Sequence, residues 1–241
     1  MSESPPVAKA SPWALARLIC GHICLHAAMA GTRMAAPLLA LELGYGALSV
    51  GFLLALYSLM QVFLAIPAGR YADQHGLKRP VGMALVAAVT GALLAAVFPR
   101  FEVLCLSALC MGGATGAASI ALQRHVGQAA HDSTELKRVF SWLAIGPAVS
   151  NFIGPVAAGL LIDHVGIWMG GSAGDDNGFR GAFVMLALLP WATWLWVRHT
   201  VELPPVAQPP GATHQHVWHL LREPRMRRLL LVNWLLASCW D

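Results

Sequence analysis

The chain has 241 residues, of which 57% are hydrophobic and only 12% charged, and its mean hydropathy is +0.59. A soluble domain carries about 25% charged residues, so this composition excludes a water-soluble fold of this size. The formal net charge of +4 comes from Lys and Arg residues that stand between apolar runs. That placement bears on membrane topology, and no nucleic-acid partner is expected. The five cysteines have neither zinc nor redox spacing, so no metal or cofactor is expected.

Six apolar runs are each long enough to cross a bilayer as a helix, which takes roughly 20 residues. Each is also far longer than the strand of a membrane β-barrel. We therefore expect an all-α transmembrane bundle over residues 13–199, embedded in the lipid bilayer, and closely packed where Gly112, Gly113 and Gly116 follow one another. The six runs cover residues 13–41, 47–68, 80–99, 102–123, 139–162 and 180–199.

The segments outside the bundle are polar or incomplete. Residues 1–12 form a short tail, and the Pro-rich residues 200–227 have the composition of a linker. Residues 228–241 return to an apolar pattern and predict the start of a seventh helix. We expect the chain to be a fragment, with a natural half-protein as the alternative.

The distribution of positive charge predicts the orientation. If the N-terminus is inside, twelve Lys and Arg residues lie on or beside the inner segments, and only Arg100 and Arg180 lie outside. Such a bias indicates a multi-pass protein of the inner (plasma) membrane with a cytoplasmic N-terminus. The inner set is Lys9, Arg70, Lys78, Arg79, Arg124, Lys137, Arg138, Arg198, Arg222, Arg225, Arg227 and Arg228.

One motif occurs twice. AGRYADQHG (68–76) and AGLLIDHVG (158–166) share the pattern A-G-x-x-x-D-x-x-G. The first closes the second run and the second closes the fifth run, which cross the membrane in opposite directions. The sequence therefore predicts two three-helix repeats that are inverted relative to each other.

The charged stretch after the second run resembles the G-x-L-A-D-R-x-G-R-R/K signature of the major facilitator superfamily. The matching residues include Gly69, Asp73, Gly76, Lys78 and Arg79, whereas Gln74 and Leu77 replace arginines. The resemblance implies a loop on the cytoplasmic side whose acid docks against the other half of a transporter and holds one access state. A carboxylate can do so by meeting a helix N-terminus. The alternative is a solvated loop whose basic residues only anchor the topology.

A second resemblance lies in the fifth run. SNFIGPVAAG (150–159) is similar to the antiporter motif of that superfamily, with Gly154, Pro155 and Gly159 at its core. Pro removes a backbone hydrogen bond and kinks a helix. The resemblance implies a kink that bends or seals this helix during exchange, and a kink for packing alone is the alternative.

Polar residues inside the runs are candidates for the substrate cavity, since each is costly in a membrane. His22, His26 and Arg33 follow one another at steps of four and seven and share one helical stripe. Arg33 is interpreted as facing an anionic substrate group, with pairing to backbone carbonyls as the alternative. Tyr57, Gln61 and Asn151 are further candidates that could equally hold helices together.

These features predict one half of a transporter. The superfamily implies twelve spans in two halves, so a C-terminal six-helix half is the expected partner, and a small molecule is the expected substrate. We expect secondary transport by alternating access, by an exporter or antiporter, with proton coupling left open. No enzyme motif is present, and a non-transporting scaffold is the second hypothesis.

Overall fold

The computed structural model describes residues 12–129, 133–172, 174–203 and 223–238. The described chain is helical and divides into two units, Met1–Pro205 and Val206–Asp241. The first unit contains the six long helices that the sequence predicts. All six are long and apolar enough to cross a membrane. They are α1 (Pro12–Glu42), α2 (Ala47–His75), α3 (Lys78–Val97), α4 (Phe101–Ala129), α5 (Ser133–Trp168) and α6 (Asp176–Val197).

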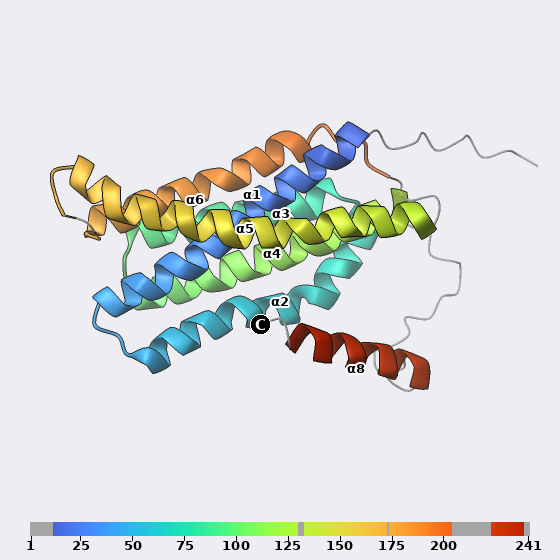
Figure 1. The fold of residues 1–241 in the computed structure, drawn as a ribbon, viewed down its shortest axis with the longest axis horizontal. Coiled ribbons are helices and arrows are strands. Elements are labelled where there is room, and N and C mark those ends of the chain that lie inside the picture. The colour runs from blue at the N-terminus through green and yellow to red at the C-terminus, as the bar shows by residue number, and fades with distance from the viewer. Residues whose placement is uncertain (1–11, 130–132, 173, 204–222, 239–241) are drawn as a thin grey trace, which may run out of the picture. The chain divides into compact units, whose positions relative to one another are not determined.

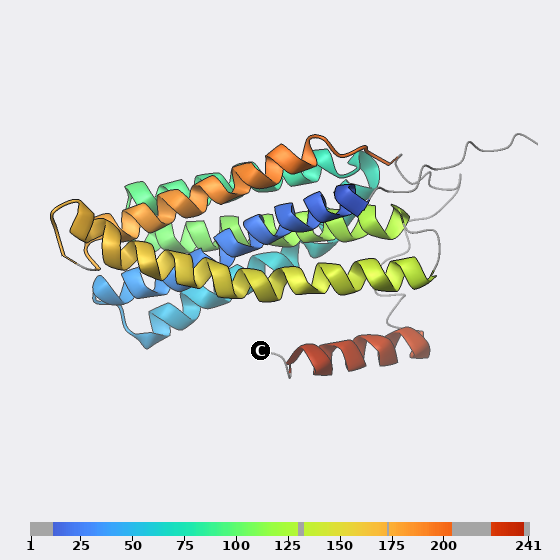
Figure 2. The ribbon, with the colours of Figure 1, turned by 45° about the horizontal axis from the view of Figure 1, so that its top comes forward.

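The helices run lengthwise in three layers (Figures 1 and 2). In the middle layer α1 contacts α4, and each of them packs against two other helices. α1 lies against α5 and α6, while α4 lies against α2 and α3. If α1, α2 and α3 are exchanged for α4, α5 and α6, the contacts of α1 with α5 and α6 become the contacts of α4 with α2 and α3. The contact pattern therefore confirms the two three-helix repeats.

Small residues allow the helices to pack closely. A Cβ added to Gly112 would collide with the backbone carbonyl of Tyr57 in α2, and one added to Gly113 would come within 3.0 Å of Met60. A Cβ added to Gly116 would lie 3.2 Å from the side chain of Gln61. This confirms the close approach predicted for these glycines, which in a membrane strengthens van der Waals contact.

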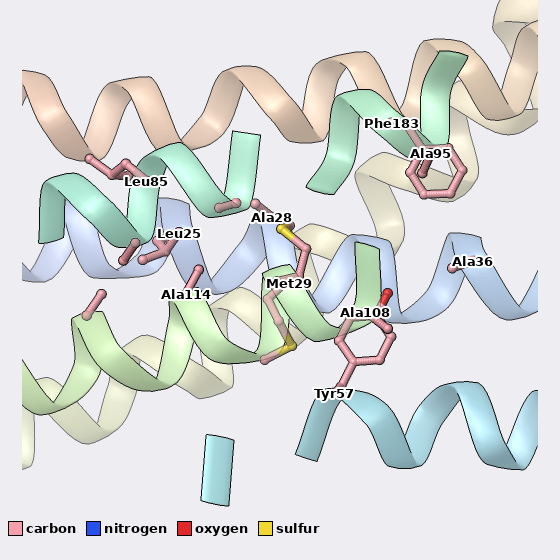
Figure 3. Close-up of a cluster of buried hydrophobic side chains, with 14 of the residues drawn as sticks. Leu25, Ala28, Met29, Ala36, Tyr57, Leu85, Ala95, Ala108, Ala114 and Phe183 are labelled. Carbon is pink, nitrogen blue, oxygen red and sulfur yellow. The ribbon is translucent and has the colours of Figure 1, made fainter. Parts of the chain in front are cut away.

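The buried core lies where α1 and α4 meet their neighbours (Figure 3). Ala28 of α1 and Ala108 of α4 are fully buried in it, and Met29 of α1 is 5% exposed. Tyr57 of α2 and Phe183 of α6 fill the larger spaces. In contrast, α2 and α5 leave much of their surface exposed, including Phe63 and Phe152 and several other large apolar side chains.

Several helices extend beyond their predicted apolar runs: α2 ends at His75, α4 ends at Ala129, α5 extends at both ends (Ser133–Trp168) and α6 starts at Asp176. The end of the apolar run at residue 68 predicts a loop over the charged stretch, but α2 continues to His75. The turn to α3 then consists of Gly76 and Leu77, with Gly76 at a φ of +74° that favours glycine. Helix hydrogen bonds satisfy the backbone in water as well as in lipid, so a helix need not end where its apolar run ends.

The second unit contains one described helix, α8 (Pro224–Ser238). Pro224 occupies its first position, which suits proline because the missing N–H has no helical partner there. The helix confirms an apolar helical segment after the Pro-rich tract and starts four residues before the predicted residue 228. Most of the predicted linker 200–227, and all but one residue of the tail 1–12, lie outside the described residues.

Candidate functional site

The end of α2 carries the charged motif, and its acid is paired. Arg124 of α4 donates from Nε to Oδ1 of Asp73 over 2.6 Å, and from Nη2 to the Asp73 backbone oxygen over 3.2 Å. The second bond satisfies one of the last carbonyls of α2, which has no helical partner. The Arg124 side chain is 11% exposed and that of Asp73 is 53% exposed. The pair therefore joins α2 to α4 at the edge of the bundle.

A second carboxylate completes this end of the molecule. Glu202, which follows α6, accepts a hydrogen bond at Oε1 from the backbone N–H of Lys78 over 2.8 Å. Lys78 is the first residue of α3, so Glu202 satisfies one of its free N–H groups. A Cβ on Gly76 would lie 3.2 Å from that oxygen, so the glycine leaves room for the carboxylate.

The second copy of the motif has a matching arrangement at the opposite end. A Cβ on Gly166 would collide with the carboxylate of Asp175. Asp175 is the N-cap of α6 and accepts a hydrogen bond from the N–H of Gly178 over 2.9 Å. In both copies the final glycine therefore borders an acid that caps the next helix. The acid is local in the second copy, whereas Glu202 reaches the first copy from the far end of the unit.

The remaining residues of the first motif differ in position. Gly69 faces Ile120 of α4, and its added Cβ would make an ordinary contact at 3.8 Å. The Arg79 side chain is exposed. At the first copy of the motif the carboxylate on a helix N-terminus is that of Glu202, while Asp73 meets the guanidinium of Arg124. Docking of Asp73 against another half of the protein stays a prediction.

The motif in α5 lies at a close helix contact. A Cβ on Gly154 would collide with the carbonyl of Ala27 and approach the backbone nitrogen of Gly31, both in α1. Gly159 accommodates the end of the Met34 side chain, at 3.4 Å from its added Cβ. Pro155 lies inside α5, as does Pro147 about two turns earlier. The glycines thus set the distance between α1 and α5.

The two histidines of α1 lie next to each other. Their ring centroids are 5.0 Å apart with the planes at 71°. His22 is 7% exposed and borders Gly146 of α5, while His26 is half-buried. Within the described part of the chain, Nδ1 of His26 is buried without a hydrogen-bond partner. The pair is therefore a polar group inside the bundle with unused hydrogen-bonding capacity.

Of the other four cavity candidates, two lie in a helix contact and two are exposed. Tyr57 is 1% exposed and lies in the contact between α2 and α4, and Gln61 is half-buried beside Gly116. Arg33 and Asn151 are exposed on α1 and α5. Substrate contact stays a prediction for all four. Tyr57 and Gln61 both lie against glycines of α4, which fits the alternative that they hold helices together.

Sequence reasoning missed four residues that hold the helices in place. The charge pattern identifies Arg124 only as a topology residue, and no motif singles out Glu202. Ser150 of α5 lies within hydrogen-bond distance of the carbonyls of Ile23 (2.9 Å) and Gly146 (2.7 Å), and Thr193 of α6 donates to that of Gly21 over 2.8 Å. In the sequence, a single polar residue within an apolar run indicates that it makes a contact between helices. The sequence does not show which residue is its partner.

The comparison of sequences identifies the family. The sequence model of the Major Facilitator Superfamily matches residues 18–240. The chain belongs to this superfamily. Its six apolar helices make it a multi-pass membrane protein of a transporter family. A comparison with curated proteins finds no match.

A solved structure has the same fold. The POT family transporter PepTSo, determined by in meso crystallisation, is similar over 83% of this chain with a TM-score of 0.64 and 15% sequence identity. The matched part covers 40% of the PepTSo chain. This superfamily chain thus spans less than half the length of that transporter, and the likeness concerns the fold.

Proposed function

We propose that the chain is one half of a secondary transporter that exports small molecules across the cytoplasmic membrane by alternating access. The observation that carries the proposal is the signature motif at the end of α2, where Asp73 is held by Arg124 on the edge of the bundle. Its carboxylate is half exposed and can exchange partners when a second half approaches. Membership of the superfamily supports the same conclusion.

The second half would cover the exposed faces of α2 and α5. Arg33 and Asn151 are exposed on the described unit and would line the space between the halves. Exchange of substrate for a proton is part of the proposal. Since the described parts of the six spans hold no carboxylate near their centres, the His22–His26 pair is the proposed interior proton carrier.

Transport by the complete protein tests this function. Everted membrane vesicles are energised to form a pH gradient, and an acridine dye reports its loss when cationic, anionic and zwitterionic compounds are added in turn. We expect at least one compound to dissipate the gradient. Failure of a broad panel would favour the non-transporting scaffold.

The gate is tested separately with Asp73→Asn, which leaves every topology-setting cation in place. We expect transport to slow about tenfold or more, because the amide cannot replace the charge that holds one access state. Asp163→Asn is the matched control, since Asp163 occupies the same position in the second motif copy and is also exposed. Equal rates for wild type and Asp73→Asn would remove the gating role while leaving transport intact.

A further inference from the structure

A groove of about 390 Å³ lies where the start of α1 meets the end of α6, and it belongs to neither motif. It is lined by Arg17, Leu195, Trp196 and His199. Figure 1 shows these two helix ends at the same end of the bundle. Both mark the limit of an apolar span, because the first span starts at Ala16 and the sixth ends at Val197. The groove is therefore at the depth where lipid headgroups lie.

A single helix contact sets the register of this groove. Thr193 donates a hydrogen bond to the carbonyl of Gly21, and a Cβ on Gly21 would lie 3.5 Å from the Thr193 methyl group. The two helices run in opposite directions here, so one turn back along α1 lies across from one turn forward along α6. That step brings Arg17 opposite residues 196–199. The basic side chain is thus positioned by packing deeper in the bundle.

Within the described residues, no carboxylate pairs with the basic side chains at the groove. Arg198 donates from Nε to Nε2 of His199 over 2.9 Å, which leaves Nδ1 as the donor of the neutral imidazole ring. Arg17 and Arg198 are both exposed. The ion pair that the described residues form is between Asp73 and Arg124, and neither of these arginines takes part in it. As far as the described part of the chain goes, two guanidinium groups and a ring N–H are therefore available to bind an anion.

The exposed face of α6 continues from the groove as an apolar track. Leu188 is 61% exposed, Trp191 57% and Leu195 51%. The steps of three and four between these residues place them on one face of the helix, and a further step of three or four reaches Arg198 and His199. A basic end joined to a long apolar track matches one headgroup with an acyl chain.

We propose that this groove binds the headgroup phosphate of an anionic phospholipid, with an acyl chain along Leu188, Trp191 and Leu195. Arg17 and His199 line the groove and supply donors, as does Arg198, which is hydrogen-bonded to His199 beside it; Trp196 forms the wall at headgroup depth, where Trp is favoured. A soluble phosphate ester offers the same anion. The apolar track favours the lipid, because a soluble ester would leave that track unused. The inference concerns a lipid site and does not depend on transport.

Native mass spectrometry of the full chain tests the site. The protein, purified in a neutral detergent, is mixed with equal amounts of dioleoylphosphatidylglycerol and dioleoylphosphatidylcholine, and the ratio of bound lipids is measured. We expect wild type to retain the anionic lipid preferentially. In Arg17→Gln/Arg198→Gln this preference should fall about fivefold for each arginine removed. The matched control is Arg100→Gln/Arg180→Gln, which removes the same charge at the opposite end of the bundle and should retain the wild-type ratio.

Two further measurements make the result decisive. His199→Gln keeps both arginines and tests whether the groove, and not net charge, holds the lipid. We expect a smaller loss of the preference for the anionic lipid than in the double variant.

In the second measurement, glycerol 3-phosphate is added as a competitor at a tenfold excess over lipid. An equal loss in both double variants, or an unchanged ratio in Arg17→Gln/Arg198→Gln, would overturn the proposal. Displacement of the lipid by glycerol 3-phosphate would overturn it in favour of a site for soluble phosphate esters.

Discussion

Glu202 caps α3 from the far end of the unit, accepting the backbone N–H of Lys78 over 2.8 Å across 124 residues of sequence. The segment after α6 is thereby tied to the turn between α2 and α3. Asp73 lies in the last turn of α2, directly before this turn, so the signature motif and the segment that leaves the six-helix unit lie close together. In the other repeat the corresponding cap is Asp175, which is only three residues from its partner Gly178. This bond therefore does not connect distant parts of the chain.

Removing the Glu202 carboxylate should destabilise the bundle slightly. In Glu202→Ala the N–H of Lys78 loses its protein acceptor, and a lost N-cap typically costs about 1 kcal/mol. The apparent melting temperature in detergent, followed by scanning fluorimetry, measures the effect. Glu42→Ala is the control, because Glu42 is also an exposed acid at a helix end. Identical melting temperatures for the two variants would show that the cap adds nothing.

A methyl group at Gly154 should force α1 and α5 apart. The new Cβ meets the backbone of Ala27 and Gly31, which cannot rotate away, so Gly154→Ala should cost about 1–3 kcal/mol by overpacking. Gly51→Ala is the matched control, since no atom lies within 4 Å of its added Cβ. Thermal unfolding in detergent compares the two. If both variants have the same melting temperature, the close approach at Gly154 is not required for stability.

The pair of Asp73 and Arg124 should contribute little to stability. Since the carboxylate is 53% exposed, we expect a coupling free energy of at most about 1 kcal/mol. A double-mutant cycle of Asp73→Asn and Arg124→Gln, read from thermal unfolding, measures it. A coupling of several kcal/mol would mean that the pair is a structural link and is poorly suited to open during exchange.

The Ser150 hydroxyl should stabilise the α1–α5 contact modestly. Ser150→Ala leaves the Ile23 carbonyl without its partner from α5, and such membrane hydrogen bonds average about 0.6 kcal/mol. We therefore expect a small fall in melting temperature. Ser58→Ala, at an exposed position of α2, should have no effect. A larger loss for the control would contradict the assignment.

Labelling of single cysteines should establish the orientation. In a background with the five native cysteines replaced by serine, Arg100→Cys should react in intact cells with a maleimide that cannot cross the membrane. Arg79→Cys should react only after the cells are opened, because it lies at the end rich in Lys and Arg. The reverse pattern would place the N-terminus outside.

The sequence by itself determined the number, order and approximate extent of the membrane helices, and the inverted repeat. These follow from local properties, because every apolar run of sufficient length must satisfy its own backbone hydrogen bonds in lipid. Gly112, Gly113 and Gly116 could be recognised as packing residues for the same reason, since a missing side chain is visible in the sequence.

Only the tertiary structure decided which residues meet. The partner of Asp73 is 51 residues away, that of Lys78 is 124 residues away, and that of Thr193 is 172 residues away. Such pairs depend on how two helices are rotated and shifted against each other, and many registers bury similar apolar area. The sequence likewise could not place Gly154 against the backbone of α1, or bring Arg17 to the end of α6. Close packing at the glycines selects one register, and that register sets every contact between helices.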